Sequence, residues 1–73
     1  MAKNVEKSPV GKDKPRIKLI GLDGNAFILL GHMRAGLKKA GFTPDEIDQF
    51  HLQATSGDYN HLLCVCGEWA DIG

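Results

Sequence analysis

The fold of this chain is decided by the stretch Phe42–Ile47, which reads FTPDEI. Thr43 is followed three residues later by Glu46, and this spacing is typical of a capping box, in which each residue satisfies a free backbone amide of the other. Pro44 suits the first helical position, where a missing amide hydrogen costs nothing. Phe42 and Ile47, the apolar residues at the two ends of the stretch, occupy the positions of a hydrophobic staple. The stretch therefore predicts a helix that begins at Pro44.

This second helix presents one apolar face and ends at a short corner. Its apolar face is predicted to hold Ile47, Phe50, His51 and Ala54. We expect the helix to end near Thr55 and Ser56, with Gly57 as the left-handed residue that follows it.

A third helix is predicted directly after the corner, with Asp58 as its N-cap. Its apolar stripe is expected to comprise Tyr59, Leu62, Leu63, Cys66, Trp69 and Ala70. Gly67 weakens this helix, and a strand over residues 62–65 is a less favoured alternative. The last three residues, 71–73, are expected to fray.

Upstream of the second helix, the sequence allows two interpretations of Ala26–Leu30. Asp23-Gly24 between apolar runs is a hairpin signal, which would make this segment a second strand. Alternatively, Asn25 is an N-cap and residues 26–40 form a helix. We favour the helix because the apolar residues recur at helical spacing: Leu29, Leu30, Met33, Leu37 and Ala40. Gly31 and Gly36 are then expected to admit a closely packed neighbour, and Gly41 to follow the helix in a left-handed conformation.

Residues 16–20 alternate enough to predict a short strand, which the sequence leaves without an obvious partner. A lone strand would leave its amides and carbonyls unpaired. We therefore consider a homodimer in which Ile17–Ile20 pairs with its copy in a second molecule. The alternative is that this segment lies over the helices as an irregular arm.

Residues 1–15 are expected to form a disordered basic tail, because they contain four lysines, two prolines and few large apolar side chains. Residues 16–73 then form a single small helical domain. The predicted fold class is mainly α: a disordered N-terminal tail, a short N-terminal β-strand and a compact three-helix bundle.

Several segments resemble one family of proteins. They are Asp23–Phe27 (DGNAF), residues 39–41 (KAG), residues 46–48 (EID) and residues 54–63 (ATSGDYNHLL). Together they are similar to small uncharacterised bacterial and phage proteins with a DGNAF start and an SGDYDHLL-like segment. The resemblance covers residues 19–70, and Asn60 stands where that family carries an aspartate. It implies a small intracellular protein of phage or mobile-element origin and brings no activity with it.

Charge and composition exclude several classes of function. The formal net charge of the chain is zero, but residues 1–15 carry a net +2 and residues 16–73 a net −2. An acidic domain lacks the basic face that displaces counterions from duplex phosphates, so we do not expect nucleic acid as a partner. The N-terminus has no secretory signal, and no stretch is apolar enough to span a membrane. These features predict a cytoplasmic protein with reduced thiols.

The residues that could support chemistry have simpler interpretations. His61 and Cys64, with Cys66 or His51, could ligate zinc, but the two cysteines would diverge on a helix. A thiol nucleophile would need an oxyanion hole that nothing in the sequence supplies. The turn before Asn25 lacks the spacing of a phosphate loop. We expect neither a metal nor a cofactor, and no catalytic residue.

Two groups of residues remain as candidates for binding a protein partner. Residues 56–61 are the densest polar string, in which Asp58, Tyr59 and His61 could face a partner. A helix corner explains the same string structurally. Arg34 and Lys38, one helical turn apart, could contribute a basic patch, although a solvated face is the usual explanation.

The sequence thus predicts a small non-enzymatic protein-interaction or regulatory module, and leaves the partner open. The alternative is a helix-turn-helix-like regulator that binds nucleic acid through its third helix. Residues 58–69, however, contain neither Arg nor Lys.

Overall fold

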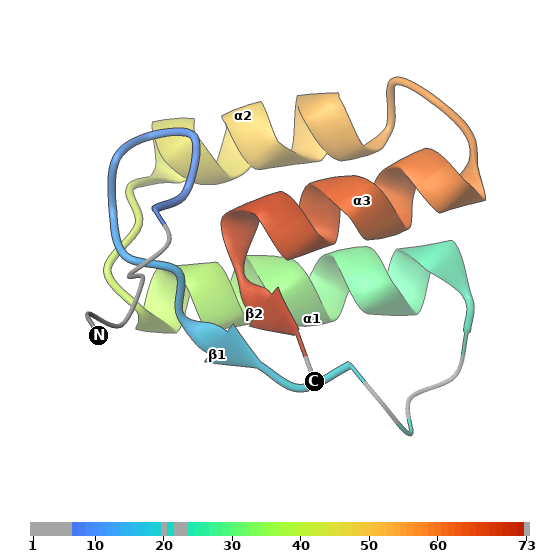
Figure 1. Ribbon diagram of the computed structural model, residues 1–73, viewed down its shortest axis with the longest axis horizontal. Coiled ribbons are helices and arrows are strands. Elements are labelled where there is room, and N and C mark those ends of the chain that lie inside the picture. The colour runs from blue at the N-terminus through green and yellow to red at the C-terminus, as the bar shows by residue number, and fades with distance from the viewer. Residues whose placement is uncertain (1–6, 20, 22–23, 73) are drawn as a thin grey trace, which may run out of the picture.

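The structure is a computed structural model that describes residues 7–19, 21 and 24–72. Its elements follow one another along the chain as β1 (Arg16–Ile17), α1 (Ala26–Lys39), α2 (Pro44–Ala54), α3 (Tyr59–Trp69) and β2 (Asp71–Ile72). The three helices lie side by side with short connections, and a pair of very short strands lies beside them (Figure 1). The predicted fold class, mainly α with a three-helix bundle after a short strand, is confirmed.

Helix α2 begins as the capping box predicts. The Thr43 hydroxyl accepts the amide of Glu46 at 3.2 Å, and the Glu46 carboxylate accepts the amide of Thr43 at 2.8 Å. At its other end, the hydroxyls of Thr55 and Ser56 each donate to a carbonyl of the last turn at 2.8 Å. Because these hydroxyls satisfy the carbonyls, no left-handed residue is needed. The prediction for Gly57 is wrong, since it does not adopt a positive φ.

Helix α1 confirms the N-cap interpretation of Asn25, whose side-chain oxygen accepts the amide of Phe27 at 2.8 Å. The hairpin alternative is therefore excluded. The helix ends as expected with Gly41 at φ 97°. Four residues of the predicted stripe are buried, namely Leu29, Leu30, Met33 and Leu37. Ala40 is exposed, because it is already the C-cap.

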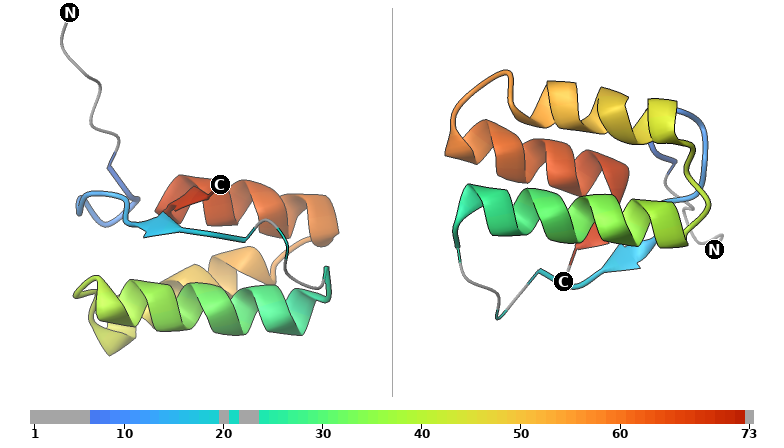
Figure 2. Two further views of the ribbon diagram at one scale, coloured as in Figure 1. Left: turned by 90° about the horizontal axis from the view of Figure 1, so that it is seen from below. Right: turned by 180° about the vertical axis from the view of Figure 1, so that it is seen from behind.

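Helix α3 is capped by Asp58, whose carboxylate accepts the amide of His61 at 2.9 Å. Its buried residues are Leu62, Val65, Cys66 and Trp69. The predicted stripe is rotated relative to this set: Val65 is buried, whereas Tyr59 and Leu63 are exposed. Val65 faces inward because α3 packs against both α1 and α2; in the left view of Figure 2 these two helices lie on the same side of α3.

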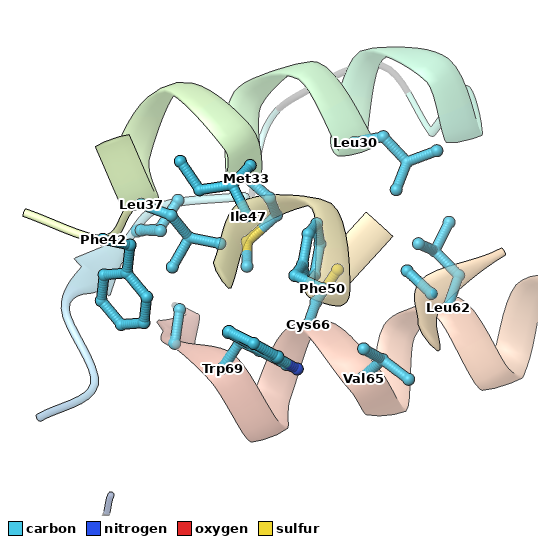
Figure 3. Packing of buried hydrophobic residues seen from close by; sticks show 13 residues of the cluster. Leu30, Met33, Leu37, Phe42, Ile47, Phe50, Leu62, Val65, Cys66 and Trp69 are labelled. Carbon is cyan, nitrogen blue, oxygen red and sulfur yellow. The ribbon is translucent and has the colours of Figure 1, made fainter. Parts of the chain in front are cut away.

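Trp69 is fully buried in the core (Figure 3). Its ring is 5.7 Å from that of Phe50 in an edge-on arrangement and 6.1 Å from that of Phe42. Its indole nitrogen donates to the side-chain oxygen of Gln53 at 3.0 Å, so the buried N–H is satisfied. One aromatic side chain therefore joins α3 to α2 and to the α1–α2 connection.

Strand β1 has a partner within its own chain, which corrects two predictions. Arg16 pairs with Asp71 and Ile17 with Ile72 in a parallel arrangement, so residues 71–72 form β2 instead of fraying. The strand covers two of the predicted residues; 18–19 lie outside it, and Ile20 lies outside the described residues. Because β1 is paired with β2, the homodimer hypothesis loses the unpaired strand on which it depended.

The N-terminal segment differs from the prediction of a tail over residues 1–15. Residues 1–6 lie outside the described residues. Residues 7–15 form a turn that contacts the helices at the end opposite the α2–α3 connection (Figure 1). Lys12 donates to the Glu46 carboxylate at 2.6 Å and to the Gly41 carbonyl at 3.1 Å, and Lys14 donates to the Gly67 carbonyl at 2.7 Å. Contacts from its lysines thus fix this segment, and the partly buried Val10 also packs against the core.

Among the described residues, none belongs to a helix with the length and apolar character needed to cross a lipid bilayer.

Candidate functional site: an apolar groove and the exposed face of α1

A groove opens where α1 begins and α2 gives way to α3. Three buried side chains line its floor: Leu30, Ala54 and Leu62. Leu30 and Leu62 point toward each other across this end of the core (Figure 3). The groove has a volume of about 280 Å³. It is large enough to receive a bulky apolar side chain from another molecule.

Two aromatic residues form the walls of the groove. Phe27, in the first turn of α1, is 84% exposed, and Tyr59, in the first turn of α3, is 43% exposed. The Tyr59 hydroxyl lies against the backbone at Gly24, where an added Cβ would come within 3.5 Å of it. Of the described residues that line the groove, Asp58 is the one that carries a charge. The groove is therefore apolar with a single acidic edge.

Phe27 lies on the exposed face of α1, away from the buried stripe. In a helix of 3.6 residues per turn, Phe27, Gly31, Arg34 and Lys38 share one side; we call these four residues the α1 face. A Cβ added at Gly31 would meet nothing within 4 Å, so the helix surface is bare at this position. The α1 face thus runs from an exposed aromatic ring at the groove to two cations at the far end.

The charge of α1 is uniformly positive. Its sequence contains Arg34, Lys38 and Lys39 and no aspartate or glutamate. Arg34 lies 3.7 Å from Asp48 of α2, a long contact between two exposed side chains. Such a pair contributes little and is easily exchanged for another. Lys38 and Lys39 are exposed and make no ion pair with the described residues.

Comparison of this chain with protein-family models, curated proteins and solved structures finds no match. Its function is therefore inferred from the groove and the α1 face.

His61 holds the α2–α3 corner together. Its Nε2 lies 2.8 Å from the Gln53 carbonyl and 3.0 Å from the Ser56 hydroxyl. Because a carbonyl only accepts, Nε2 must carry the hydrogen. The imidazole thus connects the first turn of α3 to the last turn of α2. Gly57 leaves room for it, since an added Cβ there would lie 2.8 Å from the Cβ and Cγ of His61.

Ser56 and His61 are residue types that can form a nucleophile and its general base, but their hydrogen bonds run in the wrong direction for that role. A base would have to accept the serine proton through an unprotonated nitrogen. Here Nε2 donates, and the Ser56 hydroxyl donates its own hydrogen to the Gln53 carbonyl at 2.8 Å. The pair is occupied in closing the corner, so the contact does not activate Ser56.

The two cysteines of α3 lie in different environments. Cys64 is exposed, whereas Cys66 is fully buried. Burial raises the pKa of the Cys66 thiol to about 11, so this side chain stays protonated and unreactive. Within the part of the chain that the structure describes, no three His, Cys, Asp or Glu side chains are grouped to hold a metal ion.

The structure separates the five residues predicted to bind a partner into three places. Asp58 and Tyr59 line the groove, His61 closes the corner behind it, and Arg34 and Lys38 belong to the α1 face. The sequence prediction missed Phe27, which joins the groove to the α1 face. A signal for it was available: Phe27 falls outside the apolar stripe of α1, and an aromatic side chain on the polar side of a helix has no core to enter.

Proposed function

We propose that this protein is a small non-enzymatic interaction or regulatory module that binds a protein partner through the groove and the α1 face. The observation that supports this most is Phe27, which is 84% exposed at the wall of an apolar groove. An isolated exposed apolar residue is ordinary. An exposed aromatic beside a preformed groove that a second aromatic, Tyr59, also lines is the composition of a binding hot spot.

The resemblance to small bacterial and phage proteins supports a phage or mobile-element origin, and the two free cysteines of α3 fit action in a reducing cytoplasm. The helix-turn-helix alternative has less support. Its predicted reading helix, α3, carries no Arg or Lys, and its exposed apolar residues Tyr59 and Leu63 suit a protein surface better than a phosphate backbone.

The proposal is tested by selecting peptides that bind the wild-type protein from a display library of random 16-residue peptides, and then measuring their binding to two variants. Phe27→Ser removes the wall of the groove. Leu52→Ser is the matched control, because Leu52 is also a highly exposed apolar residue (71%) but does not line the groove. Circular dichroism establishes that both variants fold.

We expect peptides enriched on the wild type to bind the Leu52→Ser variant unchanged and to lose binding to Phe27→Ser by roughly tenfold or more, as for a hot-spot residue. Peptides that bind all three proteins equally, or that depend on Leu52, would contradict the proposal.

A further inference from the structure

We infer that the partner is an acidic, amphipathic segment: one large apolar side chain enters the groove, and its carboxylates lie over Arg34 and Lys38. This inference rests on the function proposed above and adds the chemistry of the partner.

The position of the cations relative to the groove carries the inference. Along a helix that rises 1.5 Å per residue, Arg34 lies about 10 Å and Lys38 about 16 Å beyond Phe27 on the same side. A bound segment that follows α1 from the groove therefore meets an apolar site first and positive charge two to three turns later. Because α1 holds no carboxylate of its own, the complementary segment is acidic at that distance.

The groove end of the surface carries no comparable positive side chain among the residues that the structure describes. Asp58 lies at the edge of the groove, and its carboxylate caps α3. The carboxyl-terminal end of α2 also lies there, but so do the amino-terminal ends of α1 and α3, so the helix dipoles do not make this edge negative. No lysine or arginine is among the described residues that line the groove, so a carboxylate next to the apolar anchor finds no ion-pair partner there. Because the cations lie farther along α1, the carboxylates of the segment are placed away from its anchor.

The shape of the α1 face suits a closely apposed chain. Gly31 lies between the groove and the cations, and an added side chain would find open space there. A partner backbone can approach the helix at this glycine more closely than at a larger residue. The competing contact to Arg34 from Asp48, at 3.7 Å between exposed groups, is weak enough for a partner carboxylate to replace it.

The same peptide selection tests this inference, because sequencing the enriched pool gives the charge of the peptides that bind. Lys38→Glu reverses the charge of the α1 face. Lys18→Glu is the matched control, since Lys18 is exposed, lies outside α1 and changes the net charge of the protein by the same amount. Both substitutions are on the surface, and circular dichroism confirms folding.

We expect the wild-type pool to be enriched in peptides that combine a large apolar residue with Asp or Glu some distance away. An individual acidic peptide is expected to bind the Lys38→Glu variant at least roughly fivefold more weakly than the wild type, and to bind the Lys18→Glu variant with unchanged affinity. Its affinity for the wild type is expected to fall as the salt concentration rises.

The outcomes separate this inference from the proposed function. Enriched peptides that depend on Phe27 but show no acidic preference, or a basic one, would overturn the inference and leave the proposed function standing. A pool without dependence on Phe27 would overturn both. The inference would also be overturned, in favour of nucleic acid, if duplex DNA bound more tightly than the peptides and lost affinity for the Lys38→Glu variant.

Discussion

Gly31 and Gly36 of α1 look alike in the sequence, and their surroundings differ. At Gly36, an added Cβ would lie 2.6 Å from Cδ1 and 2.9 Å from Cγ1 of the buried Ile17. At Gly31, it would meet nothing within 4 Å. The sequence predicted a packed neighbour at both positions, and the prediction is wrong for Gly31. Spacing along a helix cannot say which glycine a distant strand will cross.

This difference predicts opposite effects on stability. Gly31→Ala should raise the free energy of unfolding by about 1 kcal/mol, because alanine favours the helix over glycine. Gly36→Ala should lower it, because the displacement of Ile17 from the core outweighs the same gain in propensity. Urea denaturation measures both, and a similar stabilisation of both variants would show that Ile17 does not pack against Gly36.

The cysteines of α3 should differ in reactivity. Cys64 is exposed, whereas the pKa of the buried Cys66 thiol is raised to about 11. We expect iodoacetamide at pH 8 to modify Cys64 and to leave Cys66 unmodified until the protein unfolds. Mass spectrometry of proteolytic peptides distinguishes the two sites. Equal rates would contradict the burial of Cys66.

At the scale of single elements, the sequence predicted helices well and strands poorly, for a physical reason. Each end of α2 is determined by residues within one turn of it, such as Thr43 and Glu46. Strands β1 and β2 are two residues each and lie more than fifty residues apart in the sequence, so their pairing depends on the packed bundle between them. No local pattern in residues 71–72 could indicate it.

The capping box should contribute measurably to stability. Thr43→Ala removes the hydroxyl that accepts the amide of Glu46, and we expect a loss of about 0.5–2 kcal/mol in the free energy of unfolding. Thr43→Ser, which keeps the hydroxyl, is the control and should retain most of the stability. If the two variants unfold at the same denaturant concentration, the helix does not depend on this cap.

The contact between Lys12 and Glu46 should make stability depend on acid pH. Hydrogen bonds from Lys12 and from the Thr43 amide lower the pKa of the Glu46 carboxyl below its ordinary value of 4.5. A group with a lowered pKa stabilises the fold above its unfolded pKa, and this contribution is lost as the pH falls through the folded pKa. The thermal unfolding midpoint should therefore decrease as the pH is lowered below about 4.5.

Glu46→Gln tests the source of that pH dependence. Glutamine keeps an oxygen for the Thr43 amide but loses the charge that attracts Lys12. The variant should be less stable than the wild type at neutral pH, and the difference should shrink in acid. A difference that stays constant from pH 7 to pH 3 would show that the charge of Glu46 is not involved.

At the scale of the whole molecule, the accessible surface of the chain is close to that expected of a folded monomer. Its accessible surface is 4784 Å², against about 4,500 Å² expected for a monomer of 8.0 kDa. Since β1 is also paired within the chain, a second copy is not needed to complete the core. We expect sedimentation equilibrium at high micromolar concentration to give the mass of a monomer, and a dimer mass would revive the homodimer hypothesis.

The residues of the proposed binding surface could be predicted where local sequence patterns indicate them, but not where they are brought together by distant contacts. Asp58, Tyr59, Arg34 and Lys38 were candidates on local pattern alone, and the structure places the first two at the groove and the other two farther along α1. The groove itself could not be predicted, because α1 and the α2–α3 corner meet only in the folded bundle (Figure 1).

The most direct test of the proposed surface is to map a selected peptide on the protein by ¹⁵N chemical-shift perturbation. We predict shifts in the first turn of α1, at Thr55–Leu62 and along α1 to Lys38, with none at Leu52 or at the Lys12–Glu46 contact. Shifts that are absent from the groove and centre on Leu52 or on residues 7–15 would contradict the claim that this protein binds its partner through Phe27 and the α1 face.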